Sequence, residues 1–84
     1  MVDQPDQPRV LVLTRPGCHL CEQAVAVIAA VCDETRNGWQ ERDITADPDL
    51  TSRYTDEIPV TFVDGVQHDF WRVDASRLRA ALVG

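Results

Sequence analysis

The chain has 84 residues and a formal net charge of −6, and all eight of its basic side chains are arginines. This length corresponds to one small domain, and a hydrophobic fraction of 44% suits a globular core rather than a disordered or fibrous chain. The acidic balance argues against nucleic acid or a membrane surface as partner, because both require clustered cations, and no segment approaches the roughly 20 apolar residues of a membrane span.

The first eight residues, MVDQPDQP, are acidic and rich in proline. They have neither the basic region nor the apolar region of a secretory signal, and an odd number of cysteines disfavours a secreted disulfide framework. We therefore expect a cytoplasmic monomer in which residues 1–8 form a flexible tail and residues 9–84 form the domain.

The first half of the domain predicts a strand, a long helix and a second strand. The β-branched run RVLVLT, at residues 9–14, predicts a buried strand. From about residue 18 to residue 37 apolar side chains recur at helical steps, and Gly38 is predicted to end this helix. Residues 39–44 alternate weakly and predict the second strand. The apolar positions of the helix are Cys21, Ala24, Val25, Ile28, Val31 and Cys32.

The second half predicts a short helix and then a hairpin. Asp47 is the expected N-cap of a helix that starts at Pro48 and ends near residue 54. The run VTFV, at 60–63, predicts a strand, and Asp64-Gly65 is a strong signal for a two-residue hairpin turn. The return strand is expected at about 66–71.

Asp74 is expected to cap a last helix, whose Leu78, Ala81 and Leu82 face inward. The resulting order is β-α-β-α-β-β-α. Since the crossover of a βαβ unit makes its two strands parallel, while a hairpin adds antiparallel strands, we predict an α/β fold with one mixed four-stranded sheet and helices on both faces.

Cys18 and Cys21 stand where the first strand gives way to the long helix. A helix N-terminus offers unpaired N–H groups and a partial positive charge that stabilise a thiolate at Cys18. Cys21, three positions on, can attack a mixed disulfide formed at Cys18 and release the substrate. We therefore predict that Cys18 is the nucleophile and Cys21 the resolving thiol of a redox pair.

Other interpretations of the cysteines are weaker. A zinc site requires four ligands, whereas the chain has a single C-x-x-C, and a purely structural disulfide is unusual in the cytosol. Cys32 lies about 16 Å along the helix from Cys21, too far for a bridge, and is expected in the core. His19 either favours the thiolate at Cys18 when protonated or is a solvated side chain, and both interpretations stay open.

The stretch R-P-G-C-H-L-C after a strand, followed by I-P-V before another strand, resembles the glutaredoxin branch of the thioredoxin superfamily. The resemblance runs from residue 9 to residue 82 and is closest to small bacterial glutaredoxin-like proteins. It implies a thioredoxin-like fold, a thiol–disulfide oxidoreductase acting in redox homeostasis, and catalysis by Cys18 and Cys21.

The resemblance also implies substrate-binding residues. Pro59 matches the family's cis-proline, which faces the cysteines, and Ile58 before it would pair its backbone with a bound thiol peptide. Arg15 matches a basic residue that helps to hold glutathione, although an exposed loop arginine is equally compatible. Asp74 could meet the ammonium group of the ligand or act only as an N-cap, and His19 completes the set.

The chain departs from the family where a Gly-Gly pair usually follows the hairpin, since Asp69 and Phe70 stand at about these positions. The acid would repel the carboxylate of glutathione and the aromatic ring would crowd it. The cluster Phe70-Trp71-Arg72 is weakly similar to redoxins that take electrons from thioredoxin reductase, and would also suit a protein-docking patch.

We therefore expect no permanently bound cofactor, with glutathione or another low-molecular-weight thiol as co-substrate and disulfide-bearing proteins or small thiols as substrates. Electrons would come from the glutathione system or from thioredoxin reductase. Two further functions stay open. One is a [2Fe–2S] carrier that holds its cluster between two chains through Cys18, and the other is a non-catalytic protein-binding module.

Overall fold

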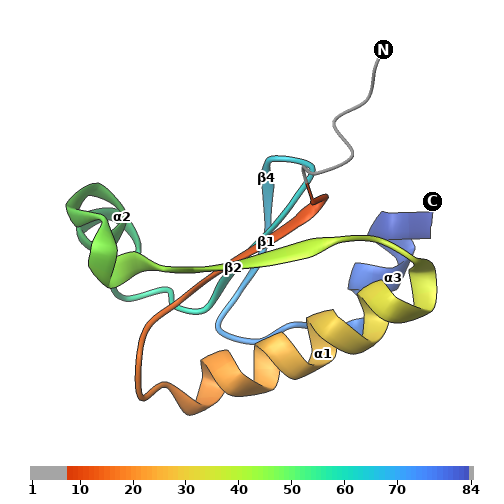
Figure 1. Cartoon of the computed structure of the whole chain (residues 1–84), viewed down its shortest axis with the longest axis horizontal. Helices are drawn as coiled ribbons and strands as arrows, with labels where there is room; N and C mark the ends of the chain where they lie inside the picture. Colours follow the sequence, from red (N-terminus) through yellow and green to blue (C-terminus); the bar gives the residue numbers. More distant parts are fainter. Residues whose placement is uncertain (1–7, 84) are drawn as a thin grey trace.

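The structure is a computed structural model that describes residues 8–83, so the tail predicted at 1–8 lies, except for Pro8, outside the described residues. The order of elements is β-α-β-α-β-β-α as predicted (Figure 1). Within the described range, no helix is both long and apolar enough to cross a membrane. The elements are β1 (Val10–Thr14), α1 (His19–Thr35), β2 (Trp39–Asp43), the 3-10 helix η1 (Ile44–Ala46), α2 (Pro48–Tyr54), β3 (Val60–Val63), β4 (Val66–Phe70) and α3 (Ala75–Val83).

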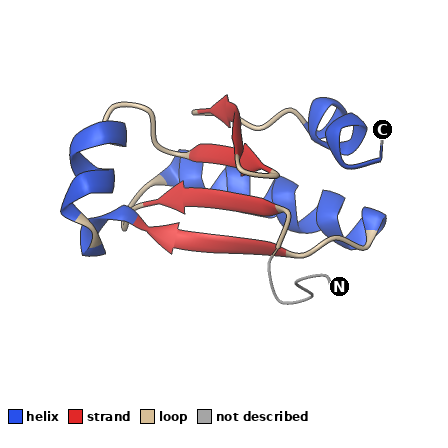
Figure 2. Ribbon diagram, turned by 90° about the horizontal axis from the view of Figure 1, so that it is seen from above, coloured by secondary structure: helices blue, strands red, loops and turns tan. Residues whose placement is uncertain are grey.

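The four strands form one mixed sheet in the order β2-β1-β3-β4. β1 pairs in parallel with β2 and antiparallel with β3, and β3 pairs antiparallel with β4. The register of the last pair shifts between Thr61 and Phe62, which places a bulge at the β4 edge. Figure 2 shows α1 running behind the strands and α2 near one end of the sheet. The predicted mixed sheet with helices on both faces is confirmed.

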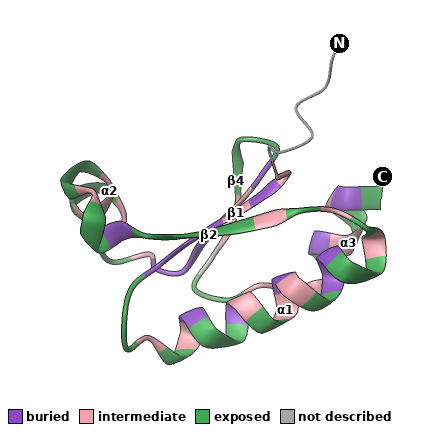
Figure 3. Ribbon diagram, in the orientation of Figure 1, coloured by how far each residue is buried: buried purple, intermediate pink, exposed green. Residues whose placement is uncertain are grey.

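Alternating residues of β1 supply the two faces of the core. Val10 and Val12 are fully buried against Ile28 and Val31 of α1. Leu13 belongs to a second cluster, whose partly buried members include two residues of α2. Buried residues accordingly follow one side of α1 and the inner strands (Figure 3).

Helix α1 ends at a left-handed residue. Arg36 has φ 60, its N–H donates to the carbonyl of Asp33 (3.3 Å), and the N–H of Asn37 donates to that of Cys32 (2.9 Å). These two bonds satisfy carbonyls that the helix end would leave unpaired. The prediction that Gly38 ends the helix was wrong, because the reversal occurs two residues earlier at an arginine.

The segment after β2 also differs from the prediction. The strand stops at Asp43, whose carboxylate accepts a hydrogen bond from the N–H of Thr45 (2.8 Å). This local bond turns the chain into η1 and buries Ile44. Asp47 then caps α2 as predicted, accepting from the N–H of Asp49 at 2.9 Å.

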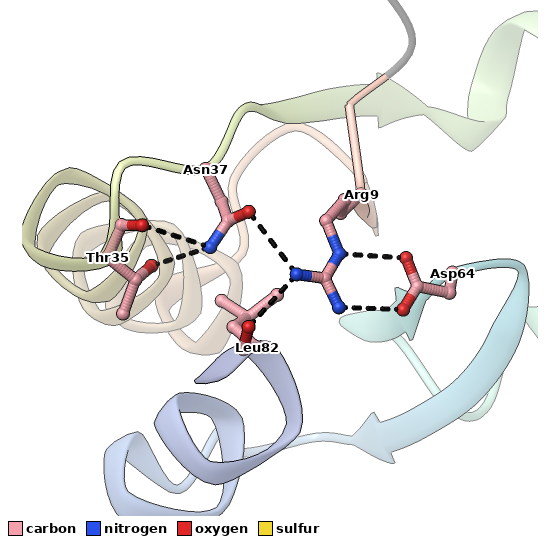
Figure 4. A network of polar contacts seen from close by, with 5 residues as sticks. All are labelled: Arg9, Thr35, Asn37, Asp64 and Leu82. Atoms are coloured by element: carbon pink, nitrogen blue, oxygen red, sulfur yellow. Dashed lines mark hydrogen bonds and ion pairs between the residues drawn. The ribbon is translucent and has the colours of Figure 1, made fainter. Parts of the chain in front are cut away.

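Arg9 links the hairpin turn to α3 and to the segment after α1. Asp64 and Gly65 have φ 53 and 84, as a two-residue turn of this kind requires. The Arg9 guanidinium donates to both carboxylate oxygens of Asp64 (3.0 and 2.9 Å), to the carbonyl of Leu82 in α3 (2.9 Å), and to the side-chain oxygen of Asn37 (3.4 Å) (Figure 4). One side chain just before β1 thus joins the hairpin, the segment after α1 and the end of α3.

Candidate active site

Cys18 is the N-cap of α1. Its backbone is extended (φ −109, ψ 110), and its sulfur accepts a hydrogen bond from the N–H of Cys21 at 3.1 Å. Gly17, with φ 72, turns the chain into this position. The sulfur thus takes the place of a capping oxygen, where a helix N-terminus stabilises negative charge. The predicted placement of Cys18 at the helix start is confirmed.

Cys21 is the hidden member of the pair, with 4% of its surface exposed, whereas Cys18 is half-buried. Burial, and secondly the hydrogen bond with Cys18, raise the pKa of Cys21 to about 12. A backbone hydrogen bond from Arg15 and the positive charge of its side chain act on this pKa in the opposite direction. Cys21 is therefore a thiol at neutral pH, and Cys18 is the accessible sulfur.

A cleft of about 380 Å³ opens over the two cysteines. Its ionisable side chains come from the loop before α1, from the first turn of α1 and from β2. The lining residues are Arg15, Pro16, Gly17, Cys18, Cys21, Glu22, Val25 and Glu41.

A second groove, of about 620 Å³, adjoins the first through Arg15. It includes Ile58, which lies in the same apolar cluster as Cys21. Trp71 has 51% of its surface exposed and φ 65, and its indole N–H donates to the carbonyl of Asp56 at 2.9 Å. The full lining is Arg15, Leu20, Thr55, Asp56, Ile58, Trp71 and Arg72.

Two of the five residues expected to bind substrate line these cavities, and a third, Pro59, directly follows one of them in the chain. Arg15 lines both, and Ile58 lines the groove. The Ile58–Pro59 bond is cis, as the resemblance implied, and the Pro59 carbonyl accepts from the backbone N–H of Trp71 at 2.7 Å. Their roles toward a substrate stay predictions.

The other two expected residues lie outside both cavities. His19 is the exposed first residue of α1. Asp74 caps α3, accepting from the N–H of Arg77 at 3.0 Å. Asp69, one of the departures from the family pattern, is paired with Arg77 at 2.9 Å, and the side chain of Phe70 lies outside the described ones.

Cys32 lies in the core as expected, with no exposed surface, and burial raises its pKa. Sequence reasoning gave no role to several residues that line the cavities, among them Leu20, Glu41, Thr55 and Asp56. Leu20 stands inside the C-x-x-C motif, which was a usable signal. Glu41 could be found only from the register of β2 against β1, which the sequence pattern does not supply.

Comparison with known proteins agrees with this geometry. A protein-family model described as "Glutaredoxin-like domain (DUF836)" matches residues 9–83. An uncharacterised protein of Mycobacterium tuberculosis is 34% identical over 79 residues, covering 88% of this chain and 81% of the relative.

Solved structures show the same architecture. The X-ray structure of a protein from X. campestris is 35% identical with a TM-score of 0.69, covering 87% of this chain and 93% of the other. The solution structure of a Nitrosomonas europaea protein is 27% identical with a TM-score of 0.73, covering 95% and 96%. A thioredoxin from Fasciola hepatica, 18% identical with a TM-score of 0.58 over 87% and 75%, shares the fold.

Proposed function

The chain belongs to the glutaredoxin-like family, and on this premise we propose that it is a thiol–disulfide oxidoreductase. The observation that carries the proposal is the pairing of two unlike thiols at one helix start. Cys18 is half-buried and accepts the N–H of Cys21 at 3.1 Å, while the Cys21 side chain is buried beneath the same cleft. An accessible sulfur at a helix N-terminus suits attack, and a protected one suits resolution.

The reaction proceeds by two exchanges. The Cys18 thiolate attacks one sulfur of a substrate disulfide, so that a mixed disulfide forms and the first substrate thiolate leaves. Cys21 then loses its proton and attacks Cys18, which forms the Cys18–Cys21 disulfide and releases the second substrate thiol. The substrate disulfide is reduced by two electrons and the dithiol of the protein is oxidised by two.

The groove that contains Ile58, Trp71 and Arg72 is where we place the chain that carries the substrate disulfide. Among the described residues, neither the Arg15 nor the Arg72 guanidinium forms an ion pair with a carboxylate. Two such cations favour an acidic segment or an anionic thiol. We propose disulfide-bearing proteins or small thiols as substrates, with the glutathione system or thioredoxin reductase as electron source.

We further propose that the protein acts in the cytoplasm, where thiols are kept reduced, as a monomer without a permanently bound cofactor. Glutathione or another low-molecular-weight thiol would serve as co-substrate. A thiol of this kind is consumed in the exchange and need not stay bound.

The experiment is a trap with Cys21→Ser. Without the intramolecular thiol, whose effective concentration far exceeds that of any free thiol, the mixed disulfide at Cys18 should persist. Mass spectrometry of the variant recovered from native cytosol should show an adduct on Cys18, and Cys18→Ser is the matched control that should carry none. A dominant glutathione adduct would identify the co-substrate.

The absence of any adduct on Cys21→Ser would contradict the proposal and favour a non-catalytic binding module. A brown colour after anaerobic purification of the unmodified protein would instead favour the [2Fe–2S] carrier. The unmodified protein, Cys21→Ser and Cys18→Ser should all be handled anaerobically, so that the comparison is matched.

A further inference from the structure

The cleft over the cysteines lies between α1 and the neighbouring strand β2. Its α1 wall is one stripe of the helix, since Cys18, Cys21 and Val25 recur at steps of three and four residues. Its β2 wall is Glu41, which stands in register opposite Val12 on the sheet face that α1 covers. The volume of about 380 Å³ lies within the range of small-molecule sites, about 300–1,000 Å³.

Charged side chains of both signs line this cleft without neutralising one another. Arg15 comes from the loop before α1, Glu22 from the first turn of α1 and Glu41 from β2. Among the described residues, none of these three side chains forms an ion pair. The larger groove shares Arg15 but has neither glutamate in its lining. The cysteine cleft therefore offers one cation and two carboxylates to a ligand.

The two carboxylates are both able to accept hydrogen bonds from a ligand. Thr14, at the end of β1, is 3% exposed, and its hydroxyl donates to Glu41 Oε2 at 2.8 Å. This bond orients the Glu41 carboxylate and leaves its other oxygen available. Glu22 is exposed, and within the described part of the chain its carboxylate has no hydrogen-bond partner.

From this arrangement we propose that the cleft binds a small aminothiol disulfide of the cystine type. In such a molecule one carbon carries both an ammonium group and a carboxylate, and it is bonded to the carbon that carries the sulfur. Glu22 and Glu41 bind the ammonium group, Arg15 binds the carboxylate, and the ligand sulfur meets Cys18. The inference rests on the proposed dithiol chemistry and names a class of small substrate for it.

The position of the charges relative to the sulfur distinguishes this ligand from glutathione. In a cystine-type ligand both charged groups lie beside the sulfur, and the charged groups of the cleft lie beside Cys18, because Arg15 and Glu22 are three and four residues from it in the chain. In glutathione the nitrogen and the carbonyl of the cysteine unit are neutral amides, and the charges lie at the two ends. An excess of carboxylates in the cleft and a net charge of −6 on the chain further favour a ligand with an ammonium group.

The exchange needs no further oxidant. The Cys18 thiolate forms a bond to one ligand sulfur as the disulfide bond of the ligand breaks, and one aminothiol leaves with the electron pair and takes a proton from solvent. Cys21 then loses its proton to solvent and bonds to Cys18, and the second aminothiol leaves in the same way. The ligand disulfide gains two electrons and becomes two aminothiols, and the protein dithiol loses two electrons and becomes a disulfide.

The test compares three disulfides on the reduced full-length protein. The probes are cystine, N,N′-diacetylcystine, which lacks the ammonium group, and cystamine, which lacks the carboxylate. Acid quenching, alkylation and mass spectrometry follow the loss of reduced protein and give a second-order rate constant for each probe. The measured quantity is the ratio of two probes in one protein, so that a general change in the reactivity of Cys18 cancels.

The variants remove one charge at a time. We expect the preference for cystine over N,N′-diacetylcystine to fall about threefold in Glu22→Gln and in Glu41→Gln, as for the loss of an exposed ion pair. The amide in Glu41→Gln keeps an oxygen that can accept from Thr14. Arg15→Gln should instead lower the preference for cystine over cystamine. Asp33→Asn removes an exposed charge further along α1, outside the cleft, and should leave both preferences unchanged.

An unchanged preference for cystine over N,N′-diacetylcystine in both Glu22→Gln and Glu41→Gln would overturn the inference while leaving the proposed function intact. A fall of equal size in Asp33→Asn would also overturn it, since that pattern indicates the net charge of the chain rather than the cleft. If neither these three probes nor the neutral hydroxyethyl disulfide oxidises Cys18 and Cys21 of the unmodified protein, the proposed function itself fails.

Discussion

At the scale of single residues, the two cysteines of the motif differ through their surroundings. Cys18 lies at the N-cap of α1 and is half-buried, whereas Cys21 lies one turn further on with 4% of its surface exposed. The sulfur of Cys18 accepts a hydrogen bond from the backbone N–H of Cys21 at 3.1 Å, whereas burial is the main cause that raises the pKa of Cys21. The cysteine side chain is therefore accessible to solvent at position 18 and buried at position 21.

This difference predicts the order of alkylation. In the reduced protein near neutral pH, iodoacetamide should label Cys18 first, because only a thiolate reacts and the pKa of Cys21 is raised to about 12. Peptide mapping by mass spectrometry measures the order. Labelling of Cys21 should increase as the pH approaches that value.

Cys18→Ser is the control, and in this variant the fast labelling should disappear. Cys32, which has no exposed surface, should stay unlabelled in the native protein. Preferential labelling of Cys21 or Cys32 would contradict the assignment of Cys18 as the nucleophile.

At the scale of elements, α1 ends on an arginine in a conformation that glycine prefers. Arg36 has φ 60, and a non-glycine residue in this region costs roughly 1–2 kcal/mol. Arg36→Gly should therefore raise the free energy of unfolding by about 1 kcal/mol, after allowance for the greater entropy of glycine in the unfolded chain. Urea denaturation measures this change.

Gly38→Ala is the companion variant. A Cβ at Gly38 would meet the Cβ of Pro8 at 3.5 Å, an ordinary contact, and no positive φ favours glycine there. Its unfolding free energy should not fall. A loss of stability in Arg36→Gly would show that the left-handed cap is not strained.

Helix α3 offers a test of the two roles considered for Asp74. Its carboxylate accepts from the N–H of Arg77 at 3.0 Å, so Asp74→Ala should cost about 1 kcal/mol of stability. Asp74→Ser retains a capping oxygen but loses the charge, and should unfold close to the unmodified protein in urea.

Reduction of glutathione disulfide by Asp74→Ser then reports the second role. If the carboxylate acts only as a cap, this variant should turn over at the unmodified rate. A raised KM for glutathione disulfide in a normally stable Asp74→Ser would show that the charge meets the ligand.

The elements that sequence reasoning located share a local cause. Asp64-Gly65 predicts a two-residue turn and Asp47-Pro48 predicts a helix start, because each depends only on contacts within a few residues. The end of α1 at Arg36 was not predicted because Gly38, a common helix stop, lies two residues further on. The turn at η1 was not predicted because it depends on a side-chain hydrogen bond to Asp43. Local sequence patterns therefore predicted an element boundary correctly where one strong signal was present, and predicted it wrongly where two signals lay close together.

The candidate site divides in the same way. The placement of Cys18 and Cys21 follows from the strand-to-helix junction and could be predicted. The contact between Thr14 and Glu41 spans 27 residues and depends on the parallel register. Register arises from the packing of whole elements, so no local pattern reveals it.

At the scale of the whole molecule, Arg9 connects parts of the chain that are remote in sequence. It donates to Asp64 in the hairpin and to the carbonyl of Leu82 in α3 (Figure 4). The hydrogen bond from Arg9 lowers the pKa of the Asp64 carboxyl. Folding stability should therefore depend on pH through this contact.

The direction of the pH dependence follows from the lowered pKa of Asp64. Because the pKa of Asp64 is lower in the folded state, its contribution is present above the ordinary value of about 3.9 and is lost as the pH falls through the folded value. Asp64→Asn keeps a residue that suits the turn but removes the charge. In urea, the stability difference between the two proteins should shrink from pH 7 to about pH 2.

The ion pair of Arg79 with Glu34 is retained in Asp64→Asn. Its effect on the pH dependence therefore cancels when the stability of the variant is subtracted from that of the unmodified protein. A difference that does not change with pH would show that the Arg9 contact contributes through geometry rather than charge.

The two outer strands of the sheet bear on how the protein behaves at high concentration. An edge strand exposes unpaired N–H and C=O groups that can template the pairing of further chains into aggregates. β2 carries the consecutive charged residues Glu41, Arg42 and Asp43, all exposed, and the β4 edge is interrupted by the bulge opposite Thr61 and Phe62. A neighbouring chain that approached either edge would meet charges or a broken ladder, so both borders of the sheet are protected against growth into fibrils.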